Sequence, residues 1–75
     1  MGKKKNLTKV EYKYIEYIEN YILEQGYPPS IREISRNMFV SVTTAHRHLT
    51  LLVDKNYLRY TPKVARSYTI KKGSA

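Results

Sequence analysis

The chain has 75 residues, enough for one small domain, and contains no cysteine, which excludes disulfide bonds, thiolate metal sites and thiol nucleophiles. No apolar run approaches the length of a membrane span, so we expect a cytoplasmic protein with no membrane partner. Lysine and arginine outnumber aspartate and glutamate by 14 to 6, and the net charge is +8. This excess of positive charge favours a polyanionic partner.

The positive charge is concentrated towards the two ends of the chain. Residues 1–9 carry +4, residues 10–40 carry −2 and residues 41–75 carry +6. A near-neutral part between two basic parts is typical of a nucleic-acid-binding protein, although charge that only maintains solubility is the alternative. We divide the chain into a flexible basic tail at 1–6, a folded domain at 7–70 and a flexible tail at 71–75.

The first predicted helix begins after Thr8, which forms a capping-box pattern with Glu11 three residues later. It runs to about residue 25 and ends at Gly26, because glycine accepts the left-handed backbone of a helix C-cap. We expect its apolar face to be buried through Ile15, Ile18 and Ile22. Three tyrosines widen this face, and we favour core packing over a partner surface for Tyr14, Tyr17 and Tyr21.

A second helix is predicted after the Tyr27-Pro28-Pro29 break, since proline cannot continue a helix. Ser30 and Glu33 repeat the capping-box pattern, and the helix spans about residues 31–37. Ile34 and Met38 are expected to face inward. A short link then leads to the next helix, which is the arrangement of a helix-turn-helix.

The third predicted helix covers about residues 41–56, with Ser41 as its N-cap. Its apolar stripe is expected to be buried and consists of Val42, Ala45, Leu49 and Leu52. Hydroxyl, imidazole and guanidinium groups occupy the other side, and such groups can hydrogen-bond base edges and phosphates in a DNA major groove. An ordinary amphipathic surface helix is the alternative interpretation.

After residue 56 the pattern changes to period two. Residues 57–60 and 67–70 alternate as strands do, around a basic loop that contains Pro62. We expect four side chains to point inward: Leu58, Tyr60, Tyr68 and Ile70. The sequence therefore predicts a mainly α fold with a small β-hairpin, a winged helix-turn-helix of three helices and a two-stranded wing.

The chain resembles the N-terminal DNA-binding domain of LexA-type repressors. The matching segments are Leu7-Thr8, Gly26-Tyr27-Pro28-Pro29-Ser30, Arg32-Glu33-Ile34, Ser41 with Ala45, His48 and Leu49, and Arg66-Ser67-Tyr68-Thr69-Ile70. The resemblance extends over about residues 7–70. It implies a winged helix-turn-helix that binds double-stranded DNA and reads its operator with the N-terminal half of the third helix.

The resemblance and the residue chemistry together give the candidate site. The expected base-reading residues are Thr43, Thr44, His46 and Arg47. The expected contacts to the DNA backbone are Ser30, Arg32 and Ser41 at or near helix N-termini, and Lys63 and Arg66 in the wing. His48 is interpreted as structural, directed toward the first helix. We expect no cofactor. We also expect no metal ion, because the two histidines lie two residues apart and point to different sides of a helix.

Three departures from the family pattern stand out. The turn between the second and third helices is one residue short and lacks the usual glycine, so Asn37 is expected to supply the left-handed backbone. The recognition positions carry different side chains, which implies a different operator. The sequence also lacks a Ser–Lys protease pair in context, so self-cleavage is not supported, and we expect a small stand-alone protein rather than an excised domain.

The function that we predict is sequence-specific DNA binding by a small transcriptional repressor associated with the nucleoid. One such module reads few base pairs, so a homodimer, tandem binding on DNA or a protein partner is expected. One alternative is an accessory factor of a plasmid, phage or mobile-element complex for replication, conjugative transfer or recombination. Another is a winged-helix protein-interaction module. An enzyme is not expected, because no phosphate-binding loop, metal cluster or nucleophile–base–acid set is present.

Overall fold

Three helices precede a short hairpin in the computed structural model, which describes residues 7–62, 66 and 68–70. The elements in chain order are α1 (Lys9–Gln25), α2 (Ile31–Met38), α3 (Val42–Asp54), β1 (Leu58–Tyr60) and β2 (Tyr68–Ile70). This order confirms the predicted winged helix-turn-helix. The predicted tails at 1–6 and 71–75, and Lys63, lie outside the described residues. Within the described ranges, no helix has the length and apolar character to cross a membrane.

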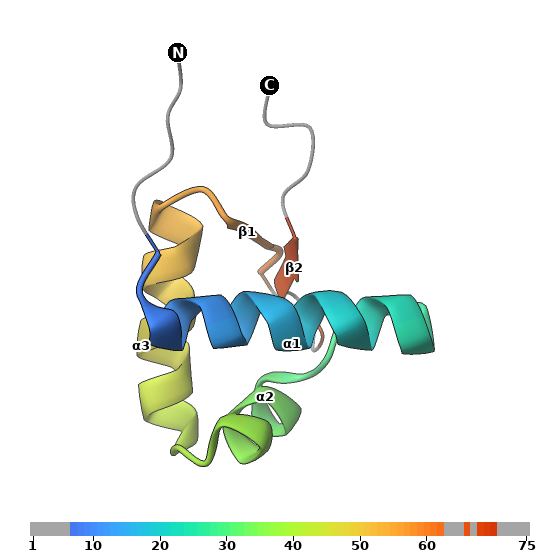
Figure 1. Cartoon of the computed structure of the whole chain (residues 1–75), viewed down its shortest axis with the longest axis horizontal. Coiled ribbons are helices and arrows are strands. Elements are labelled where there is room, and N and C mark those ends of the chain that lie inside the picture. Colours follow the sequence, from blue (N-terminus) through green and yellow to red (C-terminus); the bar gives the residue numbers. More distant parts are fainter. Residues whose placement is uncertain (1–6, 63–65, 67, 71–75) are drawn as a thin grey trace.

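The helices pack around one core. In Figure 1, α3 runs roughly perpendicular to α1 near the N-terminal end of α1, α2 lies below α1, and the strands β1 and β2 lie above it. Burial of apolar side chains from all these elements is the main force that holds them together. The buried hydrophobic residues are Tyr14, Ile18, Ile34, Ala45, Leu49, Leu52, Leu58 and Tyr68. Ile15, Tyr17, Ile22 and Met38 are partly buried and pack against this core.

Both predicted capping boxes are present. At the start of α1, the Glu11 backbone N–H donates to Thr8 Oγ1 and the Thr8 N–H donates to Glu11 Oε1, each at 3.1 Å. At the start of α2, Ser30 N–H donates to Glu33 Oε1 at 2.8 Å, and the reverse bond to Ser30 Oγ is 3.2 Å. Gly26 ends α1 with φ at 84°, as its predicted C-cap role requires.

The turn between α2 and α3 differs from the prediction. Asn37 lies inside α2, and Phe39 takes the left-handed backbone instead, with φ 59° and ψ 42°. The helix closes here because the Phe39 N–H donates to Arg36 O at 3.3 Å and the Val40 N–H donates to Ser35 O at 3.0 Å. The Phe39 side chain is 92% exposed, so its ring gains little from burial. The expectation for Asn37 is therefore wrong.

The hairpin pairs its strands antiparallel, with Leu58 opposite Ile70 and Tyr60 opposite Tyr68. Leu58 and Tyr68 are buried, and Ile70 packs partly against the core. The prediction was wrong for Tyr60, which is exposed. Tyr68 fills the core position of this pair, and the Tyr60 ring packs on it from outside with ring centroids 5.0 Å apart.

Candidate nucleic-acid interface

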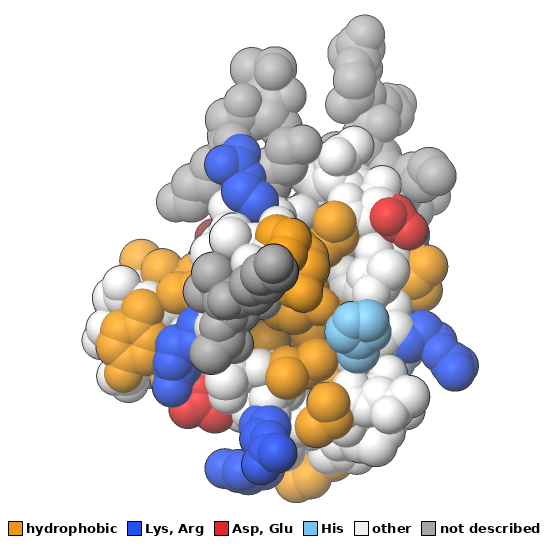
Figure 2. All heavy atoms as spheres, turned by 180° about the vertical axis from the view of Figure 1, so that it is seen from behind, with side chains coloured by type: hydrophobic (Ala, Val, Ile, Leu, Met, Phe, Trp, Pro, Cys, Tyr) orange, Lys and Arg blue, Asp and Glu red, His pale blue; other side chains and the backbone are white. Residues whose placement is uncertain are grey.

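Helix α3 has a buried back and an exposed front. Ala45, Leu49 and Leu52 have no exposed surface, and together they fix the helix against the core. Thr43, His46 and Arg47 are exposed on the other side. The structure thus brings three of the four predicted base-reading residues together on one accessible surface. Figure 2 shows basic side chains at several points around the edge of one face of the molecule, with hydrophobic side chains between them.

The N-terminus of α3 is capped by a serine and a threonine. Ser41 Oγ accepts a hydrogen bond from the Thr44 N–H and donates to Thr44 Oγ1, both at 3.1 Å. Thr44 is half-buried, so this fourth predicted base-reading residue also supports the cap. Within the described helix, the first turn of α3 contains no acidic residue. The positive end of the helix dipole therefore keeps its attraction for an anion such as a phosphate.

The N-terminus of α2 has a different electrostatic character. The Ser30 N–H donates to Glu33, so a carboxylate already occupies the position where a phosphate would bind. Hydrogen bonds from Arg66 and from the Ser30 backbone lower the pKa of Glu33 to about 2, and Glu33 is negatively charged at neutral pH. Arg32, the other predicted backbone contact in this region, is exposed.

Arg66 is directed into the protein rather than away from it. Its Nη1 donates to Glu33 Oε1 at 2.7 Å, to Pro28 O at 3.1 Å and to Tyr21 Oη at 3.2 Å. The guanidinium carbon also lies 4.9 Å from the centroid of the Tyr27 ring, which is a cation–π distance. These contacts hold the end of the hairpin loop against α1, α2 and the link between them. Arg66 is predicted from the sequence as a wing contact to DNA, and in the structure its guanidinium is already engaged by groups of the protein itself.

His48 contacts α1, as expected for a structural histidine. Its Nδ1 lies 2.8 Å from Tyr14 Oη, and the two rings meet edge to face. Burial raises the pKa of the Tyr14 hydroxyl, which remains a hydrogen-bonding group at neutral pH. In the part of the chain that the structure describes, no group of three or more potential ligands lies close enough to hold a metal ion.

Two exposed residues of α2 and α3 were not singled out from the sequence, and a third was placed on the wrong side of the surface. Arg36 is exposed on α2, one helical turn after Arg32, which gives α2 an exposed pair of cations. Thr50 is exposed on α3, one turn after Arg47. Val42 was predicted to be buried but is 42% exposed. A spacing of three or four residues along a helix, from Arg47 to Thr50 and from Arg32 to Arg36, was the signal that would have identified these two residues.

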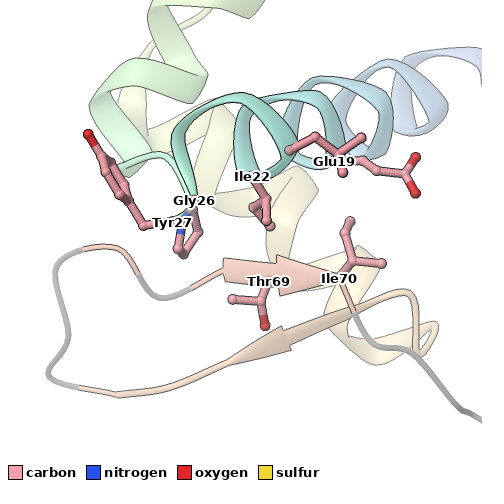
Figure 3. Close-up of a pocket in the computed structure, with 8 residues that line it drawn as sticks. Glu19, Ile22, Gly26, Tyr27, Thr69 and Ile70 are labelled. Atoms are coloured by element: carbon pink, nitrogen blue, oxygen red, sulfur yellow. The ribbon is translucent and has the colours of Figure 1, made fainter.

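An apolar pocket lies between the C-terminal part of α1 and β2. Figure 3 shows Ile22 from α1 and Ile70 from β2 directed toward the space between these elements, while the Glu19 carboxylate points away from it. Leu23 and Tyr27 also line the pocket, and Leu23 is 77% exposed. This pocket contains none of the predicted DNA-contacting residues, so it is a separate surface.

Comparison with known proteins connects this geometry to a family. Residues 4–67 match the family model described as LexA DNA binding domain. The chain is 38% identical over 68 residues to the LexA repressor of Thermosipho melanesiensis, which covers 91% of this chain and 34% of that protein.

The similarity recurs in other bacteria. The LexA repressor of Caldicellulosiruptor saccharolyticus is 43% identical over 68 residues, covering 89% of this chain and 34% of that protein. The LexA repressor of Bacillus mycoides is 38% identical over 65 residues. The chain spans about a third of the length of these relatives. Because the family model covers most of the chain, the protein belongs to the LexA DNA-binding domain family.

Proposed function

We propose that the protein binds double-stranded DNA at specific sequences through the front of α3 and acts as a small transcriptional repressor. The observation that carries this proposal is the two-sidedness of α3. Its back is fully buried, while Thr43, His46 and Arg47 are exposed on its front. A helix that is rigidly held by a core and presents donors along one side is suited to the major groove. The LexA repressors that the chain resembles support the regulatory part of the proposal.

Each candidate residue has a role in this proposal. Arg47 would donate two hydrogen bonds to a guanine, while Thr43 and His46 would contact neighbouring base edges. Thr44 would contribute a weaker contact, because its hydroxyl is already bonded to Ser41. Contacts to base edges read the sequence directly, so these four residues would contribute to the choice of operator.

The phosphate contacts would come from both helices and from the wing. Ser41 lies at the acid-free N-terminus of α3, where backbone N–H groups attract a phosphate. Arg32 would reach the same backbone from α2, and Lys63 would reach it from the wing. Ser30 and Arg66 are more restricted, because both are engaged with Glu33 and would contribute only through the donors that remain. These contacts would give affinity and register but little sequence preference.

A second candidate function follows from the apolar pocket beside α1. Leu23 and Tyr27 are 77% and 46% exposed and line this pocket together with Ile22 and Ile70, and apolar side chains that gather at one place on the surface favour a contact with another protein. An accessory factor that binds its DNA site and recruits other proteins of a replication, transfer or recombination complex would use both surfaces. A repressor that acts by occupying its operator would need only α3 and the backbone contacts.

Selection of bound duplexes from a random DNA pool tests the proposed function. The wild type should enrich one motif, and Arg47→Ala should relax the preference at one base pair, at a cost of about 1–3 kcal/mol for the preferred base. Arg32→Ala should weaken binding to all DNA sequences alike. It should also reduce the slope of log K, where K is the binding constant, against log salt concentration by about 1. Lys13→Ala removes an exposed charge from α1 and is the matched control. Failure of the wild type to enrich any motif would reject the proposal.

The accessory alternative is tested on the same motif. Leu23→Asp should leave the selected motif and the affinity of the isolated protein unchanged, since Leu23 lies outside the α3 surface. If Leu23→Asp also represses a reporter promoter carrying the motif as well as the wild type does, the repressor hypothesis is supported. If Leu23→Asp leaves DNA affinity intact but abolishes replication, transfer or recombination that depends on the motif, the accessory hypothesis replaces the repressor hypothesis.

A further inference from the structure

The first residue of α3 departs from the apolar stripe to which it belongs by sequence. Val42 is in helical register with Ala45 and Leu49, which have no exposed surface, yet 42% of Val42 is exposed. The core therefore leaves Val42 partly uncovered, although Val40, just before the helix, packs against the core. An isopropyl group is held toward solvent at the N-terminal end of the helix, where a polar residue would avoid that exposure.

Val42 lies beside one of the candidate base-reading residues. His46 is four residues later and is therefore its neighbour along the helix surface, while Thr43 lies in the same first turn but points in a different direction. All three side chains are exposed. In helix-turn-helix proteins, the N-terminal residues of the recognition helix are the ones that contact base edges. The front of α3 thus combines an apolar group with hydrogen-bonding groups at the end that would enter the groove.

Only one base presents an apolar group in the major groove, namely thymine, through its C5 methyl. We infer that Val42 contacts the C5 methyl group of a thymine in the bound site and makes that base pair a specificity determinant. This inference rests on the proposed DNA binding and adds a base preference to it. A branched side chain in a helix has one strongly preferred rotamer, so Val42 loses little conformational freedom when it makes this contact.

The Val42 contact can be tested atom by atom, because deoxyuridine lacks only the methyl group of thymidine. Starting from the selected motif, each thymine is replaced in turn by deoxyuridine, and the affinity is measured for the wild type and for Val42→Ala. One replacement should weaken wild-type binding about 3- to 10-fold, which is the expected loss for one buried methyl contact. Val42→Ala should bind the thymine site more weakly and lose its sensitivity to that one replacement.

Leu51→Ala is the matched control. Leu51 is also an apolar residue of α3 and has nearly the same exposure, 43%, but lies in the C-terminal half of the helix. It should keep the full wild-type pattern of sensitivity. Val42→Ser serves as a second variant, because its side chain carries no methyl group, so a folding defect in Val42→Ala would not decide the result. Thermal unfolding of each variant should confirm that it is folded.

The possible outcomes separate the two proposals. If a motif is selected but Val42→Ala and Val42→Ser both keep the wild-type sensitivity at every thymine, the Val42 inference is overturned while DNA binding stands. The same holds if no thymine of the motif is sensitive to loss of its methyl group. If no motif is selected at all, the DNA-binding proposal fails, and the Val42 inference fails with it.

Discussion

Arg66 Nη1 lies 2.7 Å from Glu33 Oε1, which joins the end of the hairpin loop to the first turn of α2. The same carboxylate oxygen accepts the Ser30 N–H of the capping box at 2.8 Å. Glu33 therefore has two functions at once, since it caps α2 and binds the arginine. Its charge is neutralised locally, so the N-terminus of α2 does not present an isolated negative charge to an approaching polyanion.

The Arg66–Glu33 pair makes stability depend on pH in the acid range. The pKa of Glu33 is lowered from 4.5 to about 2 in the folded protein, so the stabilisation is fully present above pH 4.5 and is lost as the pH falls toward 2. Glu33→Gln should lower the unfolding temperature at neutral pH and show no deficit near the folded pKa. Thermal unfolding of both proteins across this range measures the difference. Glu24→Gln is the control. If the unfolding temperature of Glu33→Gln stays equally far below that of the wild type at acid pH, the stabilisation does not come from the charge of Glu33.

Glu11 is the buried carboxylate of the α1 capping box, and Lys55 Nζ lies 2.6 Å from its Oε1. Burial raises the pKa of Glu11, but hydrogen bonds from Lys55 and from the Thr8 backbone outweigh this effect and lower it overall. Glu11→Ala should destabilise the protein by roughly 2 kcal/mol, because a cap and a buried ion pair are both lost. Urea denaturation measures the change, and Glu16→Ala on the exposed side of α1 should be nearly neutral. Equal effects of the two substitutions would argue against this role.

The hydrogen bond between Tyr14 and His48 can be removed with little change of shape. Tyr14→Phe keeps the buried ring but deletes the hydroxyl that lies 2.8 Å from His48 Nδ1. We expect a loss of about 1 kcal/mol, the usual net contribution of a buried hydrogen bond. Denaturant unfolding of Tyr14→Phe and of the exposed control Tyr12→Phe gives the comparison. If Tyr14→Phe is as stable as the wild type, the bond contributes nothing measurable.

The left-handed backbone at Phe39 predicts a stabilising substitution. Phe39 has φ at 59° and a side chain that is 92% exposed, so its ring contributes little while its Cβ strains the turn. Phe39→Gly should raise stability by about 0.5–1 kcal/mol, since the relief of strain exceeds the added entropy of the unfolded chain. Phe39→Ala keeps the Cβ and should show no gain. A gain of the same size in Phe39→Ala would assign the effect to the exposed ring instead.

The three helices could be predicted because helix caps and apolar spacing are set by residues close together in the sequence. The two capping boxes and Gly26 set the helix ends, and the spacing of Ala45, Leu49 and Leu52 gave the buried face of α3. The same spacing failed at Val42, because periodicity identifies a face but not where the core beneath it ends. Asn37 was chosen for the turn by its intrinsic tolerance of positive φ, but hydrogen bonds at the end of α2 placed that conformation at Phe39.

The candidate site was partly predictable for a similar reason. Exposure of Thr43, His46 and Arg47 follows from helical geometry, so their shared surface could be anticipated. The position of Arg66 could not, because its partner Glu33 is 33 residues earlier in the sequence and no local pattern links them. A basic residue in a loop was interpreted as available to DNA, whereas the folded chain uses it to bind its own carboxylate.

The contacts of Arg66 also determine how the domain reaches its folded state. They join residues separated by 33, 38 and 45 positions in the chain, so they form only after nearly the whole domain has been synthesised. Until then, the carboxylate in the first turn of α2 lacks its cation, and the hydroxyl of Tyr21 lacks this donor. Closing such long loops has an entropic cost that is recovered only when the contacts form together. The helices and the hairpin should therefore fold and unfold as one cooperative unit.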